Sequence, residues 1–141
     1  MSHRIDHVLQ HLAVENMHDM EAMLATLDSD YSVRDEVAGK CYEGMKDVGE
    51  RYAALWKAFP DFNVFPRRLM EVDDSVVMIA DYSGTHKGTY TTLNFGTFEP
   101  TGKSFNVRIV NVIDFHGDKI SRETIYMDTA SQLKQLGLLS A

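Results

Sequence analysis

The stretch SFNVRIVNVIDFHGDKISRETIYMD, Ser104–Asp128, predicts a long β-hairpin and decides the fold class. Two runs rich in β-branched and aromatic residues, Phe105–Phe115 and Ile120–Asp128, flank the tetrapeptide His116-Gly117-Asp118-Lys119. A Gly-Asp pair tolerates the positive φ angle that a tight two-residue turn needs. We therefore expect His116 to pair with Lys119 and Phe115 to pair with Ile120.

The same register predicts which side chains share a face, because side chains alternate across a strand. It places Asn111 opposite Thr124, Ile109 opposite Tyr126 and Val107 opposite Asp128. One face then carries Phe105, Val107, Ile109, Asn111, Ile113, Phe115, Ile120, Thr124, Tyr126 and Asp128. A carboxylate on a mostly apolar face must be paired, protonated or used in chemistry. Asp128 is therefore the first residue to consider for catalysis.

Composition limits the class of protein. A chain of 141 residues fits one domain, residues 1–141, with one sizeable core. A net charge of −7 without a basic cluster argues against a nucleic-acid partner. Because no apolar run is long enough to cross a bilayer and no signal peptide begins the chain, we expect no membrane partner and a cytoplasmic location. The single cysteine, Cys41, excludes an internal disulfide.

The rest of the chain contains patterns typical of both helices and strands. Helical periodicity predicts helices at Arg4–Glu15, after Asp19, and at Met45–Phe59, where Pro60 ends the helix. Strands are expected at Tyr31–Val37, Lys40–Glu43, Phe62–Val72 and Ser75–His86, and a short helix at Thr129–Leu136. Lys87–Gly102 is polar, with four glycine or proline breaks and three aromatic residues, which suits a lid or an edge loop. We expect this segment to be more mobile than the strands and to cover the mouth of the pocket.

Helices followed by antiparallel strands indicate an α+β fold. We expect a curved antiparallel sheet with the N-terminal helices packed on its concave face, which is a cystatin-like cone. Such an arrangement leaves a pocket between the layers that suits a small apolar ligand.

Several phrases resemble one family, the SnoaL-like polyketide cyclases, which have the nuclear-transport-factor-like cone fold. The phrases are Ala58-Phe59-Pro60-Asp61, Gly84-Thr85-His86-Lys87-Gly88, Pro100-Thr101-Gly102-Lys103, Lys119-Ile120, Asp128-Thr129 and Gln135-Leu136-Gly137. Their order and spacing extend the resemblance from about Tyr31 to Gly137. The chain departs from the family at Thr124, where a tryptophan is usual, and in a longer loop after His86.

The resemblance implies a cyclase without cofactor or metal that closes a ring by intramolecular aldol condensation of an apolar carbonyl or ester compound. A pocket aspartate acts there as acid and base, helped by a histidine. Asp128 resembles this aspartate, and His86 matches the Gly-Thr-His-x-Gly phrase. A ketosteroid-isomerase-like isomerase, an epoxide hydrolase of the same fold and a non-catalytic ligand-binding or dimerisation domain are the alternatives.

Each candidate residue also has a simpler interpretation. Asp128 suits the N-cap of the last helix as well as a general base with a raised pKa. His86 fits an exposed strand end as well as a proton donor.

Four residues are candidates for substrate binding: Tyr126, Asn111, Asp35 and Trp56. Tyr126 and Asn111 are potential oxyanion donors that also fit an ordinary core. Asp35 falls on the apolar face of its strand, where it is either a second carboxylate or a strand-end residue near solvent.

Two further features bear on ligands and partners. His3, His7 and His11 recur at helical spacing opposite Ile5, Leu9 and Leu12, and we interpret them as a solvated polar face rather than a metal site. The second face of the hairpin carries Arg108, Val110, Val112, Ile125 and Met127, with Glu123 opposite Val112. Since the helices cannot cover this face, we expect a homodimer through it, with Arg108 and Glu123 paired at its rim.

Overall fold

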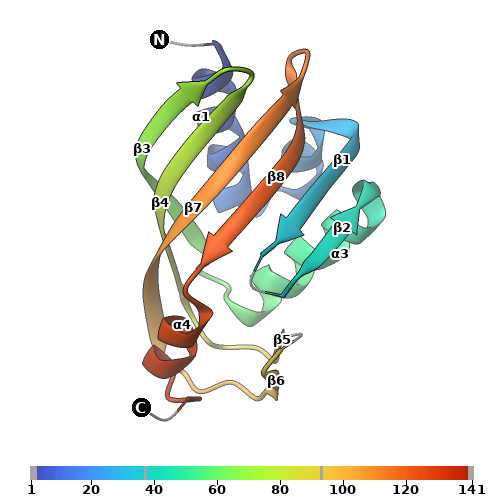
Figure 1. Ribbon diagram of the computed structural model, residues 1–141. Helices are drawn as coiled ribbons and strands as arrows, with labels where there is room; N and C mark the ends of the chain where they lie inside the picture. The colour runs from blue at the N-terminus through green and yellow to red at the C-terminus, as the bar shows by residue number, and fades with distance from the viewer. Residues whose placement is uncertain (1–2, 37, 93, 140–141) are drawn as a thin grey trace.

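The computed structural model describes residues 3–36, 38–92 and 94–139, in which helices pack against one curved sheet (Figure 1). The elements in chain order are α1 (His3–Asn16), α2 (Met20–Ala25), β1 (Leu27–Asp35), β2 (Lys40–Glu43), α3 (Gly44–Ala58), β3 (Asn63–Val72), β4 (Ser75–Thr85), β5 (Tyr90–Thr92), β6 (Gly96–Phe98), β7 (Ser104–His116), β8 (Lys119–Met127) and α4 (Thr129–Gln135). Every helix and strand expected from the sequence is present. The strand expected at Tyr31–Val37 begins earlier, and Val37 lies outside the described residues.

The main sheet has six strands in the order β2-β1-β8-β7-β4-β3. All neighbours are antiparallel except β1 and β8, which run parallel, so the sheet is mixed rather than wholly antiparallel as expected. No hairpin joins these two strands, and their direction is therefore not fixed by a turn. A small second sheet, β5 with β6, forms within Lys87–Gly102, where no strand was expected.

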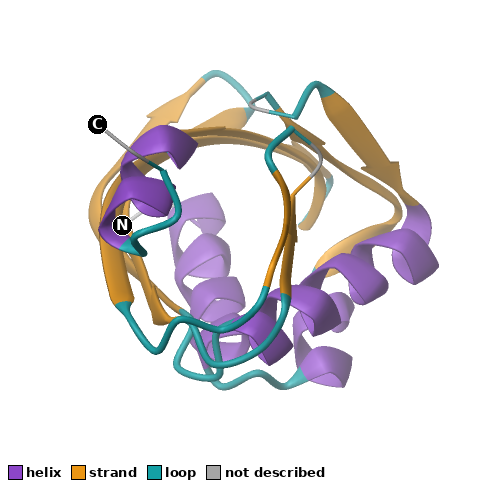
Figure 2. Cartoon of the chain, turned by 90° about the horizontal axis from the view of Figure 1, so that it is seen from below, coloured by secondary structure: helices purple, strands orange, loops and turns teal. Residues whose placement is uncertain are grey.

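The sheet curves around α1 and α3, which lie on its concave side as expected (Figure 2). The core fills this side with residues such as Val8 from α1, Tyr52 from α3 and Ile113 from β7, each at most 2% exposed. Val8 and Leu12 are one helical turn apart, and β7 buries every second residue from Phe105 to Ile113, as the two periodicities require. Among the described residues, no helix has the length and hydrophobicity needed to cross a bilayer.

The β7–β8 hairpin has the expected turn but an unexpected register. His116 pairs with Lys119 and Phe115 with Ile120, and Gly117 takes a φ of 61° at the tip. The next pair joins Asp114 to Arg122, which leaves Ser121 as an extra residue, a β-bulge. The Ser121 hydroxyl donates to the Asp114 carbonyl oxygen at 3.2 Å.

This bulge reverses the facing of β8, because a shift of one residue moves every later side chain to the other face. Glu123 opposes Ile113 and Ile125 opposes Asn111, so both lie on the concave side with Met127. Tyr126 opposes Val110 on the outer side and is 48% exposed. The predicted faces were correct for β7 and for Ile120 but wrong for β8 beyond the bulge.

The outer face differs from the predicted one in composition but stays apolar. Val77 pairs with Val112 and Ile79 with Val110, and these four side chains form a half-buried block on the convex side. The predicted rim pair is wrong: Arg108 bonds Asp81 at 2.6 Å, while Glu123 points inward. An apolar block of this kind on an open sheet face favours association with another surface.

We propose that two copies of the chain associate through this convex face, since a two-fold axis lets the same strip serve both subunits. Val110→Glu places a carboxylate in the centre of the block and is expected to give a 16.0 kDa monomer in sedimentation equilibrium. Ala53→Glu, on the exposed side of α3, is the matched control and should sediment like the wild type. A wild-type monomer at tens of micromolar, roughly where a stable dimer has formed, contradicts the proposal.

Candidate active site

A pocket of about 590 Å³ lies between the concave face of the sheet and the helices. Its wall combines apolar side chains such as Leu12, Phe62 and Ile109 with a few polar ones. Thr89–Thr92, Asn94 and Phe95, from the β5–β6 segment, contribute to the same wall. The volume and the mixed lining are typical of a small-molecule site. The segment expected to form a lid therefore borders the pocket, and its mobility stays a prediction.

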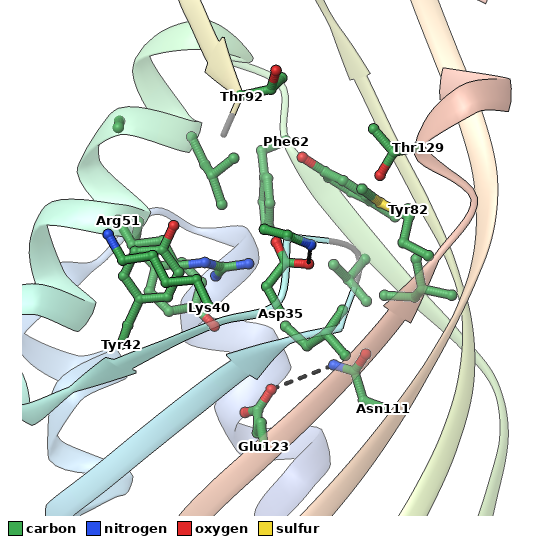
Figure 3. A pocket seen from close by; sticks show the side chains of 18 of the residues that line it. Asp35, Lys40, Tyr42, Arg51, Phe62, Tyr82, Thr92, Asn111, Glu123 and Thr129 are labelled. Carbon is green, nitrogen blue, oxygen red and sulfur yellow. Dashed lines mark hydrogen bonds between the residues drawn. The ribbon is translucent and has the colours of Figure 1, made fainter. Parts of the chain in front are cut away.

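A cluster of buried titratable groups lies in the pocket wall. His11 from α1 faces Glu15, one turn further along the helix, at 3.7 Å from Nε2 to Oε1. The same Nε2 lies 3.5 Å from Oε1 of Glu123 on β8. All three residues are at most 5% exposed. Asn111 on β7 donates from Nδ2 to Oε2 of Glu123 at 3.4 Å (Figure 3).

Hydrogen bonding fixes the tautomer of His11. The Thr26 hydroxyl donates to the carbonyl oxygen of Met23 at 2.6 Å, so its oxygen is left to accept. His11 Nδ1 lies 2.6 Å from this hydroxyl and must therefore carry the proton. The second nitrogen, Nε2, is the one that titrates, and it faces both carboxylates. The cluster is thus arranged to exchange a proton at one defined place.

Burial and neighbouring charge shift the protonation equilibria of this cluster. Burial raises the pKa of Glu123 above its ordinary 4.5, against the lowering effect of the positive charges of His11 and Arg51. For His11, burial opposes the charged form, but the hydrogen bond and charge of Glu15 and the charge of Glu123 prevail and raise the pKa above 6.5. Both groups therefore hold a proton more tightly in the folded protein.

The two raised pKa values change the stability of the protein with pH in the same direction. A raised pKa in the folded state stabilises the fold while the group is protonated. The contribution is complete below the ordinary pKa, 6.5 for His11 and 4.5 for Glu123, and it is lost as the pH rises through the folded value. Both groups thus make the protein less stable toward alkaline pH.

Two of the predicted binding residues line the pocket. Asn111 does so from β7, and its Oδ1 has no hydrogen-bond partner among the described residues. Asp35 lines it from the end of β1, where its Oδ1 accepts from the backbone N–H of Ala38 at 3.1 Å. The predicted facing of both side chains was correct, because side chains alternate without interruption along β1 and β7 up to these positions.

Asp128 and Tyr126 do not reach the pocket, so their predicted placement was wrong. Asp128 is exposed and caps α4, with Oδ1 accepting from the backbone N–H of Ser131 at 2.9 Å. The simpler interpretation of this residue, the N-cap, therefore describes its contacts. Tyr126 lies on the convex face. In both cases the cause is the bulge at Ser121, which reverses the facing of the second strand.

His86 and Trp56 are buried or half-buried but lie outside the pocket wall. His86 is fully buried rather than exposed, its Nδ1 accepts from the backbone N–H of Thr101 at 3.2 Å, and its ring packs near Phe59. Its contacts hold the base of the segment that carries β5 and β6. Trp56 stacks on His18 with ring centroids 4.8 Å apart, which fills the space beyond the end of α1. The structure therefore does not bring these residues to the wall of the pocket.

The sequence contains a signal for the residues that were missed. Val8, His11, Leu12 and Glu15 occupy positions i, i+3, i+4 and i+7 and form the buried face of α1. The interpretation of His11 as part of a solvated face was therefore wrong. In a regular β8 strand, Ile120 would lie on one face and Ile125 and Met127 on the other. Apolar residues that change face in this way along one strand are the pattern that a bulge produces.

The described residues contain no group of three or more histidine, cysteine or acidic side chains arranged to hold a metal ion.

The raised pKa of His11 can be measured by proton NMR titration of the imidazole. We expect a midpoint above 6.5 in the wild type and a lower midpoint in Glu15→Gln, because Glu15 is the main group that favours the charged ring. Glu36→Gln, a change at an exposed carboxylate outside the pocket, should leave the midpoint unchanged. A His11 midpoint that does not respond to Glu15→Gln contradicts the described contact.

The capping role of Asp128 predicts the order of stability of two variants. Asp128→Ala should lower the free energy of unfolding by about 1 kcal/mol, because the first turn of α4 loses its side-chain acceptor. Asp128→Asn should stay close to the wild type, since asparagine caps equally well. Urea denaturation measures both, and equal losses in the two variants would show that the charge, not the cap, matters.

Three solved structures show the same fold. A protein from Jannaschia sp. CCS1, assigned to the SnoaL-like polyketide cyclases, has a TM-score of 0.83 at 16% identity over 98% of this chain and 94% of its own. A ketosteroid-isomerase-like protein from Catenulispora acidiphila, in complex with trimethylamine, scores 0.78 at 20% identity, with 94% and 93% covered. An NTF2-like protein from Burkholderia thailandensis scores 0.78 at 21% identity, with 96% and 98% covered.

At these identities the similarities establish the cone fold. No curated protein matches the sequence. The model of the SnoaL-like polyketide cyclase family matches residues 5–136, which is nearly the whole chain. The chain therefore belongs to the SnoaL-like polyketide cyclase family.

Proposed function

We propose that this protein is an enzyme that closes a ring by acid–base catalysis, through an intramolecular aldol addition on an apolar carbonyl or ester compound. The observation that carries the proposal is the buried His11–Glu15–Glu123 cluster in the wall of a largely apolar pocket. Groups with raised pKa values in a pocket are suited to move protons near neutral pH. Family membership supports the reaction class.

In this mechanism Glu123 is the general base. Its carboxylate removes a proton from the carbon beside one carbonyl group, and the electron pair of that C–H bond forms an enolate. The enolate carbon then bonds to a second carbonyl carbon of the same molecule, whose oxygen becomes an alkoxide. The alkoxide takes the proton back from the cluster and becomes a hydroxyl group, which returns Glu123 to its carboxylate form.

The neighbours of Glu123 have separate tasks. His11 Nε2 faces the carboxylate at 3.5 Å and shares the abstracted proton, while its Nδ1–H bond to Thr26 keeps the ring oriented. Asn111 holds the second carboxylate oxygen of Glu123 at 3.4 Å. The apolar wall around them excludes water, which strengthens these electrostatic interactions. This assignment replaces Asp128, which is exposed.

A diketone in which benzoyl and acetyl groups are joined by a trimethylene chain tests the proposal, because its acetyl methyl carbon can close a six-membered ring on the benzoyl carbonyl. Proton NMR in heavy water follows deuterium uptake next to the carbonyls and ring closure together. We expect wild-type protein to accelerate both, and Glu123→Gln to slow both by roughly 10²–10⁴-fold. Asp128→Asn is the matched control and should keep the wild-type rate.

The outcomes separate the alternatives. Deuterium uptake without ring closure favours an isomerase, which shares the enolate step but returns the proton to another carbon. No acceleration of either process favours a non-catalytic ligand-binding domain. Wild-type rates in Glu123→Gln would remove the general-base assignment.

A further inference from the structure

Two cationic side chains line the pocket wall where α3 meets β2. Arg51 comes from α3 and Lys40 from β2, and Tyr42 lies beside both (Figure 3). Lys40 Nζ is 4.6 Å from the centroid of the Tyr42 ring, and Arg51 Cζ is 5.5 Å from the same centroid. Arg51 Cζ also lies 5.6 Å from the Tyr52 ring. These ring faces hold the cations in position by cation–π attraction.

The aromatic rings do not satisfy the hydrogen-bonding capacity of these cations. A guanidinium has five N–H donors in a planar fork, and an ammonium has three. Among the described residues, none accepts a hydrogen bond from Arg51 or Lys40, and no carboxylate lies within 4.0 Å of either. A half-buried arginine with open donors in a pocket wall is suited to bind an anion.

Most acidic residues of the pocket have partners other than these two cations. Asp35 is the cross-strand partner of Lys40, and its charge also acts on Arg51. Glu15 and Glu123 lie with His11, and the charge of Arg51 also acts on Glu123. Glu50 bonds Lys46 at 2.8 Å, and Asp47 is exposed at the rim, where solvent screens its charge. Asp35 is thus the carboxylate that offsets these two cations most directly, and one carboxylate neutralises at most one of them.

We propose that Arg51 and Lys40 form a subsite for one negatively charged group of the substrate in which two oxygens share the charge, a carboxylate or the enolate of a β-diketone. This assignment rests on the proposed function, in that it takes the pocket as the substrate site. The fork of Arg51 matches two oxygens that lie in one plane. The substrate is thus an apolar monoanion that is held by its charged end while a carbon elsewhere in the molecule meets Glu123.

Calorimetric titration with matched probes tests the subsite without requiring turnover. β-Naphthoate carries a carboxylate, and β-naphthamide has nearly the same shape without charge. We expect wild-type protein to bind the naphthoate at least roughly tenfold more tightly, because hydrogen bonds to charged groups are the stronger ones. Arg51→Met should abolish this preference. Arg122→Met, at an exposed arginine on the convex side of β8, is the control and should retain it.

A second variant and a second anionic probe complete the test. Lys40→Gln, at an exposed residue whose replacement the fold tolerates, should reduce the preference if Arg51→Met proves unstable. Ionised benzoylacetone tests the enolate against the carboxylate, and tighter binding of one of them identifies the substrate group. Equal affinity of wild-type protein for naphthoate and naphthamide overturns the proposal. So does a preference that survives in Arg51→Met, or a naphthoate that does not bind at millimolar concentration.

The proposed function and the subsite fail in different ways. Glu123→Gln should bind β-naphthoate at least as well as the wild type, because it removes a negative charge from the pocket. If the naphthoate preference is present but the diketone reaction is not, the subsite stands and the catalytic proposal falls. The reverse result leaves the catalytic proposal and removes the subsite.

Discussion

The extra residue at Ser121 determines which side chains of β8 enter the pocket. A strand buried on one face offers every second residue to the core, and one inserted residue exchanges the two sets. With the bulge, Glu123 joins His11 inside and Tyr126 turns outward. Without it, the concave face would carry a tyrosine and an exposed helix cap would be buried. The chemistry of the site thus depends on one backbone irregularity, which the Ser121 hydroxyl stabilises by its bond to Asp114.

The buried cluster is an electrostatic compromise. Three titratable groups at most 5% exposed are costly to charge, since the interior replaces water with a weakly polarisable medium. The hydrogen bonds that His11 donates to Thr26 and that Asn111 donates to Glu123, together with the attraction between imidazolium and carboxylate, offset part of this cost. For Glu123 the cost of burial that remains raises the pKa. For His11 the attraction of Glu15 and Glu123 exceeds that cost, and the pKa is raised as well. The same balance that lowers stability toward alkaline pH keeps a proton available inside the pocket.

The fold was predictable from the sequence to a greater extent than the site. Helical spacing, the glycine turn at Gly117 and the proline after Phe59 act locally, so they identify helices and strands correctly. Asn111 and Asp35 were placed correctly because their strands alternate without interruption up to those positions. Asp128 and Tyr126 were misplaced because a bulge is set by tertiary packing, and a regular alternation was extended through it. His11 was misplaced because the apolar face was drawn through Ile5, Leu9 and Leu12, whereas the buried face of α1 carries Val8, His11, Leu12 and Glu15.

The central claim is that Glu123 lies inside the pocket as a carboxyl group ready to exchange a proton. Carbon NMR of the Glu123 side-chain carboxyl, followed through a pH titration, measures this most directly. A midpoint above 4.5 is predicted, because burial disfavours the charged form more than His11 and Arg51 favour it. A midpoint at or below 4.5 would mean that the carboxylate is solvated or fully paired, and it would contradict the assignment of Glu123 as the general base.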